Sequence, residues 1–452
     1  MNSIHRRWLI VIILVSVVLR LAAALYMGNH VTDLPGTYDQ ISYDSLARRV
    51  ITGYGFSFDQ AWWPATAANT PTSHWSFLYT IYLAIVYDVF GFTPLAARII
   101  QAILAGILMP LLLFRLGNRA FGAVIGLVAA GISAIYIYFF YYSASLMTET
   151  FFILGILWSL DIAIGIRDTN NPRLIQWVLL GIAMTITTLL RQTFLPIILL
   201  IGAWLWYAAS GFRMKIVKGF SLSLLIVLLG IVPWTIRNYL NFHQFVLLNT
   251  NAGYAFYWAN HPIFGTRFTN ELPPGVTWSS LLPQELIGMD EASLEKALLS
   301  RAIQTIKNDP GRYILLSISR IKEQFWFWPS PRSTLLSNVS RTGSFGLFLP
   351  FMCYGVCLVL FRPKKFIFYK EISMDGRTSL SAWLKSPIAL WLFFFCLYTI
   401  IHLASWAAVR YRLPTDAVMI IFAAVGVVEL FELLRSKISY KRTQEIPAPA
   451  QQ

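Results

Sequence analysis

The sequence predicts an all-α polytopic membrane protein with about ten transmembrane helices, and three observations support this fold class. Hydrophobic residues make up 57% of the 452 residues and charged residues only 13%, and the mean hydropathy is +0.60. Apolar runs of bilayer-spanning length recur along the chain, and Lys and Arg cluster at the ends of these runs. Such a composition excludes a set of soluble domains.

The formal net charge of +15 is explained by the same arrangement, because basic residues gather at the cytoplasmic ends of membrane spans. In a soluble protein this charge would indicate a nucleic-acid partner. The chain contains neither a glycine-rich phosphate loop nor an RNA-binding aromatic motif, so we expect no nucleic-acid partner.

The first apolar run, Trp8 to Met27, is interrupted only by Arg20 and follows the triplet His5-Arg6-Arg7. Positive charge before a first span places the N-terminus in the cytoplasm. The triplet Ala22-Ala23-Ala24 also fits a signal-peptide cleavage site. Both interpretations place the next segment, with Asp39, on the outer side of the membrane.

The first outer loop is predicted to cover residues 28–94. Its first part, 29–73, is rich in Gly, Pro, Ser, Thr and aromatic residues, and it contains a predicted short helix over 42–51 that ends at Gly53. The apolar segment 75–90 is about 16 residues long, whereas a spanning helix needs about 20. We therefore expect 75–90 to form a helix that lies at the membrane surface.

Further spans are predicted from the apolar runs at 95–115, 121–141, 149–166, 174–190, 193–209, 219–236, 345–361, 386–404 and 413–434. The positive-inside rule tests the assignment of 75–90, because adding one span there would move every later basic cluster to the outer side. These clusters are Arg115/Arg119, Arg167/Arg173, Arg213/Lys215/Lys218, Arg362/Lys364/Lys365 and Arg435/Lys437/Lys441/Arg442. The rule therefore supports a surface helix at 75–90.

The chain divides into an N-terminal transmembrane core that includes the first outer loop, an outer insert, C-terminal transmembrane helices and a cytoplasmic tail, at residues 1–236, 237–344, 345–434 and 435–452. Within the insert, Asp290 is predicted to cap a helix over 291–307 that ends before Pro310. A second, amphipathic helix is predicted over 312–327. We expect these helices to form a small domain that covers the outer face.

Acidic side chains on the outer face are the first candidates for a functional site. The stretch Tyr38-Asp39-Gln40-Ile41-Ser42-Tyr43-Asp44 places two carboxylates where the chain first leaves the bilayer, and Glu149 begins an apolar helix. Carboxylates at a membrane interface are costly, so Asp39 and Glu149 are candidates for general-base or metal chemistry. The alternatives are helix-capping aspartates in a solvated loop and, for Glu149, a carboxylate that complements the helix dipole.

Three arginines on the same face are candidates for binding an anionic group. Arg191 interrupts apolar sequence between two spans, and Arg410 and Arg412 flank Tyr411 on the side where positive charge is disfavoured. A guanidinium suits a phosphate group because it can donate two parallel hydrogen bonds to it. The alternative is structural, since an arginine at a helix end can also extend its charge to the interface.

His74 follows Pro71-Thr72-Ser73, and a lone histidine is more often a hydrogen-bonding partner than a metal ligand. The sequence contains no HExxH spacing and no cysteine pair that would indicate a metal site. A divalent metal cofactor is therefore left open, with no ligands assigned.

A series of short motifs runs along nearly the whole chain: Asp39-x-x-x-Tyr43 with Ala47 and Gly53, Pro71, Ala97-Arg98, Leu146-Met147-Thr148-Glu149, Pro233-Trp234-Thr235-Ile236-Arg237-Asn238-Tyr239, Asn249-Thr250-Asn251-Ala252-Gly253, Asn260-His261-Pro262 and Arg410-Tyr411-Arg412-Leu413-Pro414. In this order they resemble the bacterial glycosyltransferase family 39 proteins. That family is related to the protein O-mannosyltransferases and the lipid A aminoarabinose transferases, which share the GT-C membrane fold.

The resemblance implies a role for each acidic candidate. Asp39 corresponds to the family's loop aspartate, the proposed base for the acceptor hydroxyl, and Glu149 falls where the family has an acidic residue at the second outer turn. The sequence departs from the family at two places. Gln40 replaces the acid that often follows the aspartate, and Thr72-Ser73-His74 replace a proline-rich stretch that contains lysine.

We therefore predict an integral membrane glycosyltransferase that moves a sugar from a polyprenyl-phosphate donor to a hydroxyl of a lipid, glycan or protein acceptor. The predicted location is the inner (plasma) membrane, with both termini cytoplasmic and the site on the outer face. Asp39 and Glu149 are assigned to catalysis, and substrate binding is assigned to Tyr43, His74, Arg191, Arg410, Tyr411 and Arg412.

Two alternatives come from other functional classes. A transporter or flippase for lipid-linked glycans should bury charged residues within its spans and show pseudo-symmetric halves, whereas here the charges gather at one face and no internal repeat is visible. A non-catalytic membrane scaffold would bind a partner through its outer insert, and its outer acids would be dispensable.

Overall fold

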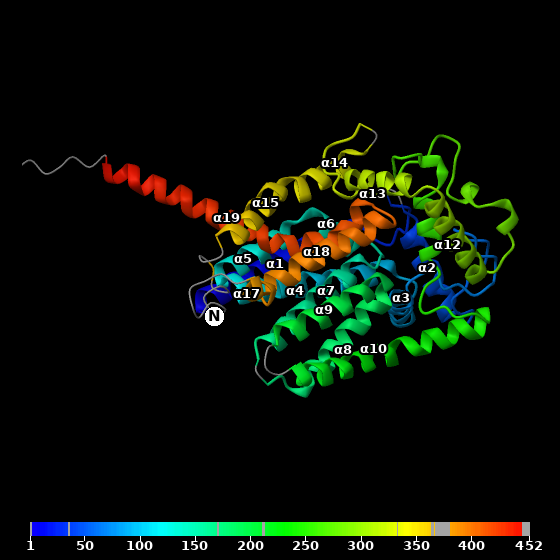
Figure 1. Cartoon of the computed structure of the whole chain (residues 1–452), viewed down its shortest axis with the longest axis horizontal. Helices are drawn as coiled ribbons and strands as arrows, with labels where there is room; N and C mark the ends of the chain where they lie inside the picture. Colours follow the sequence, from blue (N-terminus) through cyan, green and yellow to red (C-terminus); the bar gives the residue numbers. More distant parts are fainter. Residues whose placement is uncertain are drawn as a thin grey trace, which may run out of the picture.

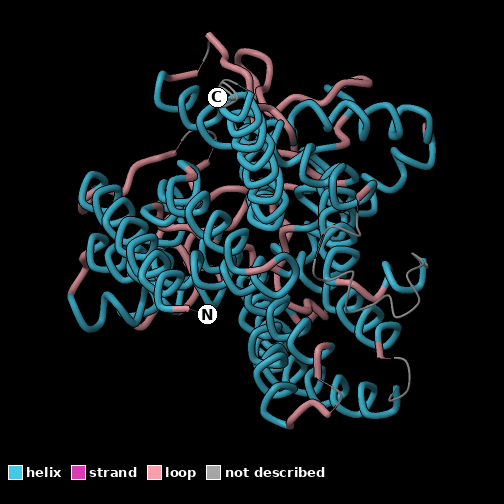
Figure 2. Tube along the Cα trace, turned by 90° about the vertical axis from the view of Figure 1, so that its left-hand side faces the viewer, coloured by secondary structure: helices cyan, strands magenta, loops and turns pink. Residues whose placement is uncertain are grey.

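The structure, a computed structural model, describes residues 2–34, 37–169, 171–209, 213–331, 333–362, 366 and 380–444, without the side chains beyond residue 437. The regular elements among these residues are helices. β-type pairing among them is limited to three isolated bridges in the first outer loop. Figure 1 shows a bundle of long helices with shorter helices gathered at one end, and Figure 2 shows the molecule from its opposite end. The predicted all-α polytopic membrane fold is confirmed. Lys364, Lys365 and residues 445–452 of the predicted tail lie outside the described residues.

Seven helical segments among the described residues are long and apolar enough to cross a membrane: α1 (Ser3–Met27), α4 (Pro94–Phe121), α7 (Glu149–Arg167), α10 (Arg213–Phe242), α14 (Leu335–Arg341) continued through η5 (Thr342–Gly346) into α15 (Leu347–Phe361), α18 (Pro387–Ala404) and α19 (Val409–Gln444). An eighth span is formed if α5 (Ala123–Ile135) and α6 (Ile137–Ala144), which meet at a bend of 54°, count as one. The two remaining predicted spans correspond to shorter apolar helices, α8 (Leu174–Leu190) and η1 (Gln192–Phe194) with α9 (Leu195–Ala208).

α7 is the most enclosed of the candidate spans, with 83% of its apolar window buried against 22% for α1 and for α10. It packs against α4, α8 and α19. Glu149 is the first residue of α7, so this central helix fixes the position of the carboxylate at one end of the bundle.

α19 is held closely against α15 because glycines face the neighbouring backbone. A Cβ on Gly355 would lie 1.9 Å from the carbonyl oxygen of Phe422, and a Cβ on Gly426 would lie 2.5 Å from that of Phe351. Small residues at helix contacts let two backbones approach in this way. The contact fixes α19, whose first turn carries Arg410.

The first outer loop contains α2 (Asp39–Ile51) and α3 (Phe77–Phe90), which pack against each other. α2 begins three residues before the predicted helix, so Asp39 lies in its first turn and not in a loop. The backbone N–H of Asp39 donates to Thr37 Oγ1 at 3.1 Å, which starts the helix at this point. α3 forms as predicted, while its position at the membrane surface stays a prediction.

The insert is built from α11 (Ala252–Ala259), α12 (Glu291–Asn308) and α13 (Pro310–Gln324), with short turns η2 (Pro262–Phe264), η3 (Ser279–Leu281) and η4 (Gln284–Leu286) between them. The predicted cap is confirmed, since Asp290 Oδ1 accepts from the N–H groups of Ala292 and Ser293 at 3.0 and 3.1 Å. The predicted second helix starts two residues early, at Pro310, because proline suits the first helical position. A short α17 (Leu380–Leu384) precedes α18.

A single buried carboxylate joins the insert to the first outer loop. Glu291 is 5% exposed. Its Oε2 accepts from the hydroxyls of Thr66 and Thr72 at 2.8 and 2.7 Å, and its Oε1 accepts from the N–H of Ser73 at 2.7 Å and the hydroxyl of Thr250 at 2.5 Å. Hydrogen bonds to a charged group are stronger than neutral ones, so Glu291 holds these two segments as one unit.

The two ends of the bundle differ in what they carry. In Figure 1 the N-terminus and the far end of α19 lie at one end, whereas α2, α3 and α12 lie at the other. The first outer loop and the insert therefore share an end of the molecule, as the charge parity predicts.

Candidate functional site

Asp39 and Arg410 form an ion pair at the end of the bundle that carries α2 and the insert. Arg410 Nη1 lies 2.6 Å from Asp39 Oδ2, and the same nitrogen donates to Thr37 Oγ1 at 2.9 Å. The two side chains are 20% and 19% exposed. They come from helices at opposite ends of the chain, and both remain accessible to a substrate.

Glu149 and Arg191 form a second and more deeply buried pair. Arg191 Nη2 lies 2.5 Å from Glu149 Oε1, and Arg191 Nε donates to Thr148 Oγ1 at 2.8 Å. Glu149 is 1% exposed and Arg191 16% exposed. The second carboxylate oxygen, Glu149 Oε2, is buried without a hydrogen-bond partner in the described part of the chain. An unsatisfied buried carboxylate oxygen is costly, so this atom is a candidate contact for a substrate hydroxyl.

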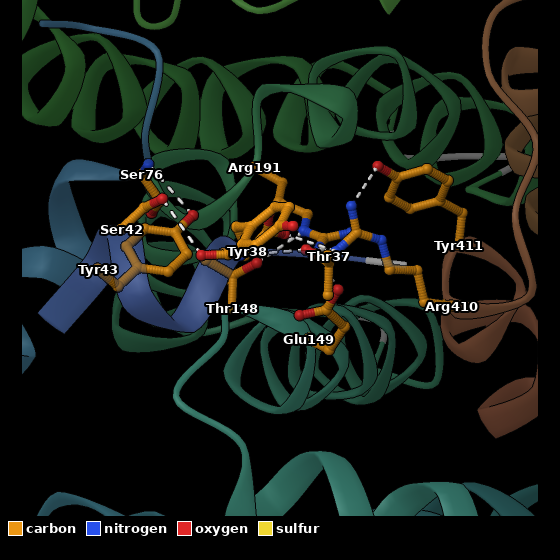
Figure 3. Close-up of polar contacts among 11 residues, drawn as sticks. Thr37, Tyr38, Ser42, Tyr43, Ser76, Thr148, Glu149, Arg191, Arg410 and Tyr411 are labelled. Atoms are coloured by element: carbon orange, nitrogen blue, oxygen red, sulfur yellow. Dashed lines mark hydrogen bonds and ion pairs between the residues drawn. The ribbon is translucent and has the colours of Figure 1, made fainter. Parts of the chain in front are cut away.

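Tyr411 lies next to both arginines, and Figure 3 shows its hydroxyl bonded to Arg410. Arg410 Nη2 donates to the Tyr411 hydroxyl at 3.0 Å. The guanidinium carbons of Arg410 and Arg191 lie 4.9 and 5.6 Å from the centre of the Tyr411 ring. The His402 ring stacks on Tyr411 with the two centroids 4.8 Å apart. Two cations can share one ring because its face is electron-rich.

The electrostatics of the site depend on these partners. Burial alone acts to raise the pKa of the Asp39 carboxyl, but the charge of Arg410, hydrogen bonds with Thr37 and Arg410, and the charge of Arg191 together outweigh burial, so the pKa lies below its usual value. Asp39 is thus ionised at neutral pH, and its carboxylate is paired with the Arg410 guanidinium. Asp39 and Arg410 carry opposite charges, so this pair adds no net charge to the site.

Tyr43 and His74 lie beside this cluster and not within it. The Tyr43 hydroxyl accepts from the Ser76 N–H at 3.4 Å, and its ring packs edge-on against Trp75. His74 is enclosed by aromatic rings, with Trp75 and Tyr254 at centroid distances of 5.2 and 5.4 Å. Burial lowers the pKa of His74 despite the opposing charges of Glu291 and Asp39, so the ring is neutral at neutral pH.

Arg412 lies apart from the other predicted substrate-binding residues. Its side chain is 0% exposed, and its Nε lies 3.0 Å from Asp416 Oδ1. The guanidinium also donates to the Gln324 carbonyl oxygen at 3.0 Å and lies 3.6 Å from the centre of the Phe345 ring. Its Nε and Nη1 are thus bonded inside the bundle, and its Nη2 is buried without a hydrogen-bond partner in the described residues.

Several residues of the site were not singled out in the sequence. Thr37 and Thr148 each accept from one of the arginines, and His402 stacks on Tyr411. Thr148 lies within the motif at 146–149 and Thr37 directly precedes the stretch at 38–44, whereas nothing in the apolar run around His402 marks it. Only the packing of α18 against α19 brings His402 to Tyr411.

Gln40, the first departure from the family pattern, has a defined structural role. Its Oε1 accepts from Arg98 Nη2 at 3.3 Å, and its Nε2 donates to the Thr32 carbonyl oxygen. Arg98 is fully buried and also donates to the carbonyl oxygens of His30 and Ala144, both at 2.9 Å. Gln40 therefore fastens the first turn of α2 without adding a third acid to the site.

No metal centre is evident in the described residues, where no group of three or more His, Cys, Asp or Glu side chains is placed to hold a metal ion. The acids of the site are each engaged by an arginine. The residues present therefore do not assemble into a metal site around Asp39 or Glu149.

Comparison with known families gives one match. Residues 75–236 match the family of dolichyl-phosphate-mannose-protein mannosyltransferases. This range is less than half of the chain and includes Glu149 and Arg191, but neither Asp39 nor Arg410. No curated protein matches the chain.

The fold is similar to that of solved membrane glycosyltransferases. The oligosaccharyltransferase AglB from Archaeoglobus fulgidus, solved with an inhibitory peptide and a dolichol-phosphate, gives a TM-score of 0.58 at 16% identity, over 99% of this chain and 52% of AglB. Its apo form gives 0.59 at 16% identity, over 99% and 53%. ArnT from Cupriavidus metallidurans bound to undecaprenyl phosphate gives 0.41 at 12% identity, over 98% and 81%. The chain thus spans about half the length of AglB.

Proposed function

We propose, from the premise that the chain has the GT-C fold, that it is an integral membrane glycosyltransferase that takes a sugar from a polyprenyl-phosphate donor. The observation that carries the proposal is the Asp39–Arg410 pair. A candidate base and a candidate phosphate ligand lie 2.6 Å apart, and both are partly exposed at the end of the bundle that carries the insert. Glycosyl transfer from a phosphate-linked donor is accelerated by a base near the acceptor hydroxyl and by a cation near the leaving phosphate.

In the proposed step, Asp39 takes the proton of the acceptor hydroxyl as the acceptor oxygen forms a bond to the anomeric carbon of the sugar. The bond from that carbon to the phosphate oxygen breaks, and polyprenyl phosphate leaves with the electron pair. Arg410 stabilises the charge that develops on the leaving phosphate. A positioned base is worth about 10²–10⁴-fold in rate. A single displacement of this kind inverts the anomeric configuration.

The pairing of the two residues implies an order of binding. While Arg410 is paired with Asp39 it keeps the pKa of the Asp39 carboxyl low, which makes the carboxylate a weak base. A donor phosphate competes with Asp39 for the Arg410 hydrogen bonds. When the phosphate takes them, Asp39 loses its main stabilising charge and becomes a stronger base. Donor binding thus prepares the site for the acceptor.

The remaining residues support these two. Arg191 approaches the same Tyr411 ring as Arg410 and is the proposed second contact for the donor phosphate. Glu149 holds Arg191 in place, and its unpartnered oxygen is the proposed contact for a substrate hydroxyl. Tyr43 and His74 pack among aromatic rings beside Asp39. They are proposed to form part of the surface that binds the acceptor.

The structural relatives support a lipid-linked donor. AglB was solved with a dolichol-phosphate, and its fold matches this chain over nearly all of the chain's length. A donor anchored in a bilayer must be met at the membrane surface. A site between helix ends and a covering insert suits that requirement.

We also propose that the site opens on the outer side of the membrane, with both termini in the cytoplasm. Cysteines introduced at Gln60 and Ser279, which are exposed at the insert end, should react with a membrane-impermeant thiol reagent in intact cells of a cysteine-free variant. A cysteine at Ser436, near the far end of α19, should react only after the membrane is opened, because the basic clusters place that end inside. Labelling of Ser436→Cys in intact cells would reverse the orientation.

The function itself is tested with the purified protein in nanodiscs, with a panel of polyprenyl-phosphate sugars and hydroxyl acceptors. We expect transfer of sugar with release of polyprenyl phosphate. Movement of the intact lipid-linked sugar between leaflets of proteoliposomes, without transfer, would instead identify a flippase. Absence of both activities across the panel would favour the scaffold.

A further inference from the structure

Helix α13 of the insert has its polarity reversed relative to a helix in a water-soluble domain. Its fully buried side chains are Leu316, Arg320 and Gln324, each 0% exposed. Its exposed side chains are mainly aliphatic: Ile314 at 57%, Leu315 at 54%, Ile318 at 57% and Ile321 at 45%. A helix that covers a domain in water buries its apolar stripe and exposes its polar one. α13 instead buries Arg320 and Gln324 and exposes four aliphatic side chains.

The polar side of α13 is used to attach it to the rest of the molecule. Arg320 donates to the carbonyl oxygen of Leu403 at 2.9 Å and to that of Ala259 at 2.5 Å. The Tyr313 hydroxyl donates to the carbonyl oxygen of Ala404 at 3.0 Å. These bonds join α13 to the end of α18 and to α11, so the aliphatic side must face away from the protein.

The C-terminal end of α13 reaches beside the middle of a spanning helix. The rings of Phe325 and Phe395 lie 6.3 Å apart, and Phe395 belongs to α18, which ends at Ala404. At 1.5 Å per residue, Phe395 lies about 13 Å below that end. The N-terminal part of α13 contacts the end of α18 through Tyr313. α13 therefore descends along α18 toward the bilayer core.

The surroundings of this face are those of a protein surface in lipid. Leu335, Leu336 and Val339 begin the span that follows and are 80%, 56% and 49% exposed, which continues the aliphatic surface. Lys322 Nζ lies 6.0 Å from the centre of the Trp328 ring. A lysine on an apolar helix face can extend its charge out of the leaflet to the lipid–water boundary, where tryptophan is also enriched.

We propose that α13 and the segment 325–328 form a re-entrant element whose aliphatic face, Ile314, Leu315, Ile318 and Ile321, contacts acyl chains of the leaflet at the insert end. The occupant of this face is bulk lipid, because α13 packs against the spanning helix α18 and the guanidinium groups of Arg312 and Arg320 are bonded to the protein on the other side. This inference does not depend on the proposed chemistry.

The proposal links the lipid surface to the candidate site. Arg412 Nη1 donates to the carbonyl oxygen of Gln324, and Arg412 is two residues from Arg410. α13 thereby sets the depth of Arg410 relative to the bilayer. A phosphate at the lipid surface would then lie at a fixed height relative to the arginine proposed to bind it.

The test is spin labelling of single cysteines in nanodiscs, after Cys353, Cys357 and Cys396 are replaced by alanine. Labels at Ile314, Ile318 and Ile321 are compared with an aqueous reference at Ser279 and a lipid reference at Leu199, which is 69% exposed on α9. Oxygen concentrates in the bilayer and a nickel chelate stays in water. We expect the oxygen-to-nickel accessibility ratio at Ile318 to exceed that at Ser279 several-fold and to approach that at Leu199.

The re-entrant geometry adds a depth order, in which the ratio increases from Ile314 to Ile318 to Ile321. A ratio at Ile318 equal to that at Ser279 would overturn the proposal, since the face would be in water. Low access to both reagents would also overturn it, because a partner protein or a second copy would then cover the face. Equal ratios at the three positions would contradict the descent of α13 into the leaflet.

Discussion

Replacing Asp39 with asparagine should lower sugar transfer by about 100-fold or more, because the substitution removes the proposed proton acceptor and keeps the side chain's size. The ion pair adds a second expectation. Asparagine no longer competes with the donor phosphate for Arg410, so donor binding should be unchanged or tighter while kcat falls. The measurement is transfer by the purified variant, with donor affinity determined separately.

Asp44→Asn provides the matched control on the same helix. Asp44 accepts from Arg48 at 2.7 Å and from the Tyr87 hydroxyl at 2.6 Å, so its role is to hold α2 against α3. This variant should lose some thermal stability, while transfer per folded molecule stays near the wild-type value. Transfer by Asp39→Asn at the wild-type rate would remove Asp39 from the mechanism.

Replacing Arg410 with lysine should weaken donor binding by about tenfold or more, because lysine keeps the charge and loses the paired donors that match phosphate oxygens. Arg301→Lys, at an exposed arginine of the insert, is the control and should bind donor normally. Donor affinity that is the same in Arg410→Lys, Arg410→Ala and the wild type would assign Arg410 to structure alone.

Arg410→Ala has a further signature in the pH dependence of kcat/KM, which reports the ionisation of the free enzyme. The Arg410 charge is the main factor that lowers the pKa of Asp39. Its removal should raise that pKa, so the fraction of ionised Asp39 falls sooner as the pH decreases. The acid limb of the profile should therefore move to higher pH in Arg410→Ala than in the wild type.

The helices could be predicted because their determinants are local. Apolar runs, a capping aspartate at 290 and the prolines near helix starts identify the elements from neighbouring residues. The pairing of Asp39 with Arg410, across 371 residues, could be predicted only as a shared face of the membrane. Which carboxylate meets which arginine depends on the packing of α2, α7 and α19, and that information is spread over many contacts.

Arg412 shows how a short error in a helix boundary changes an interpretation. The sequence predicts a span from residue 413 and assigns Arg410 and Arg412, just before it, to the same substrate-binding role. α19 begins at Val409, so the motif is helical. Two residues along a helix differ in direction by roughly 200°. Arg410 and Arg412 therefore point to opposite sides, toward Asp39 and toward Asp416.

The hydrogen bonds of Glu291 to residues 66–73 can form only late in the synthesis of the chain. The carboxylate that organises residues 66–73 is translated 218 to 225 residues after its partners. At about 5–20 residues per second this is a delay of about 10–45 s. In that interval the chain from α4 to α10 leaves the ribosome and can enter the membrane. Residues 66–73 of the first outer loop cannot yet bond to Glu291. Arg410 is translated later still, so most of the helical bundle is synthesised before Arg410 can pair with Asp39. A defect at Glu291 would therefore leave residues 66–73 without this anchor in a chain whose first spanning helices have already been synthesised.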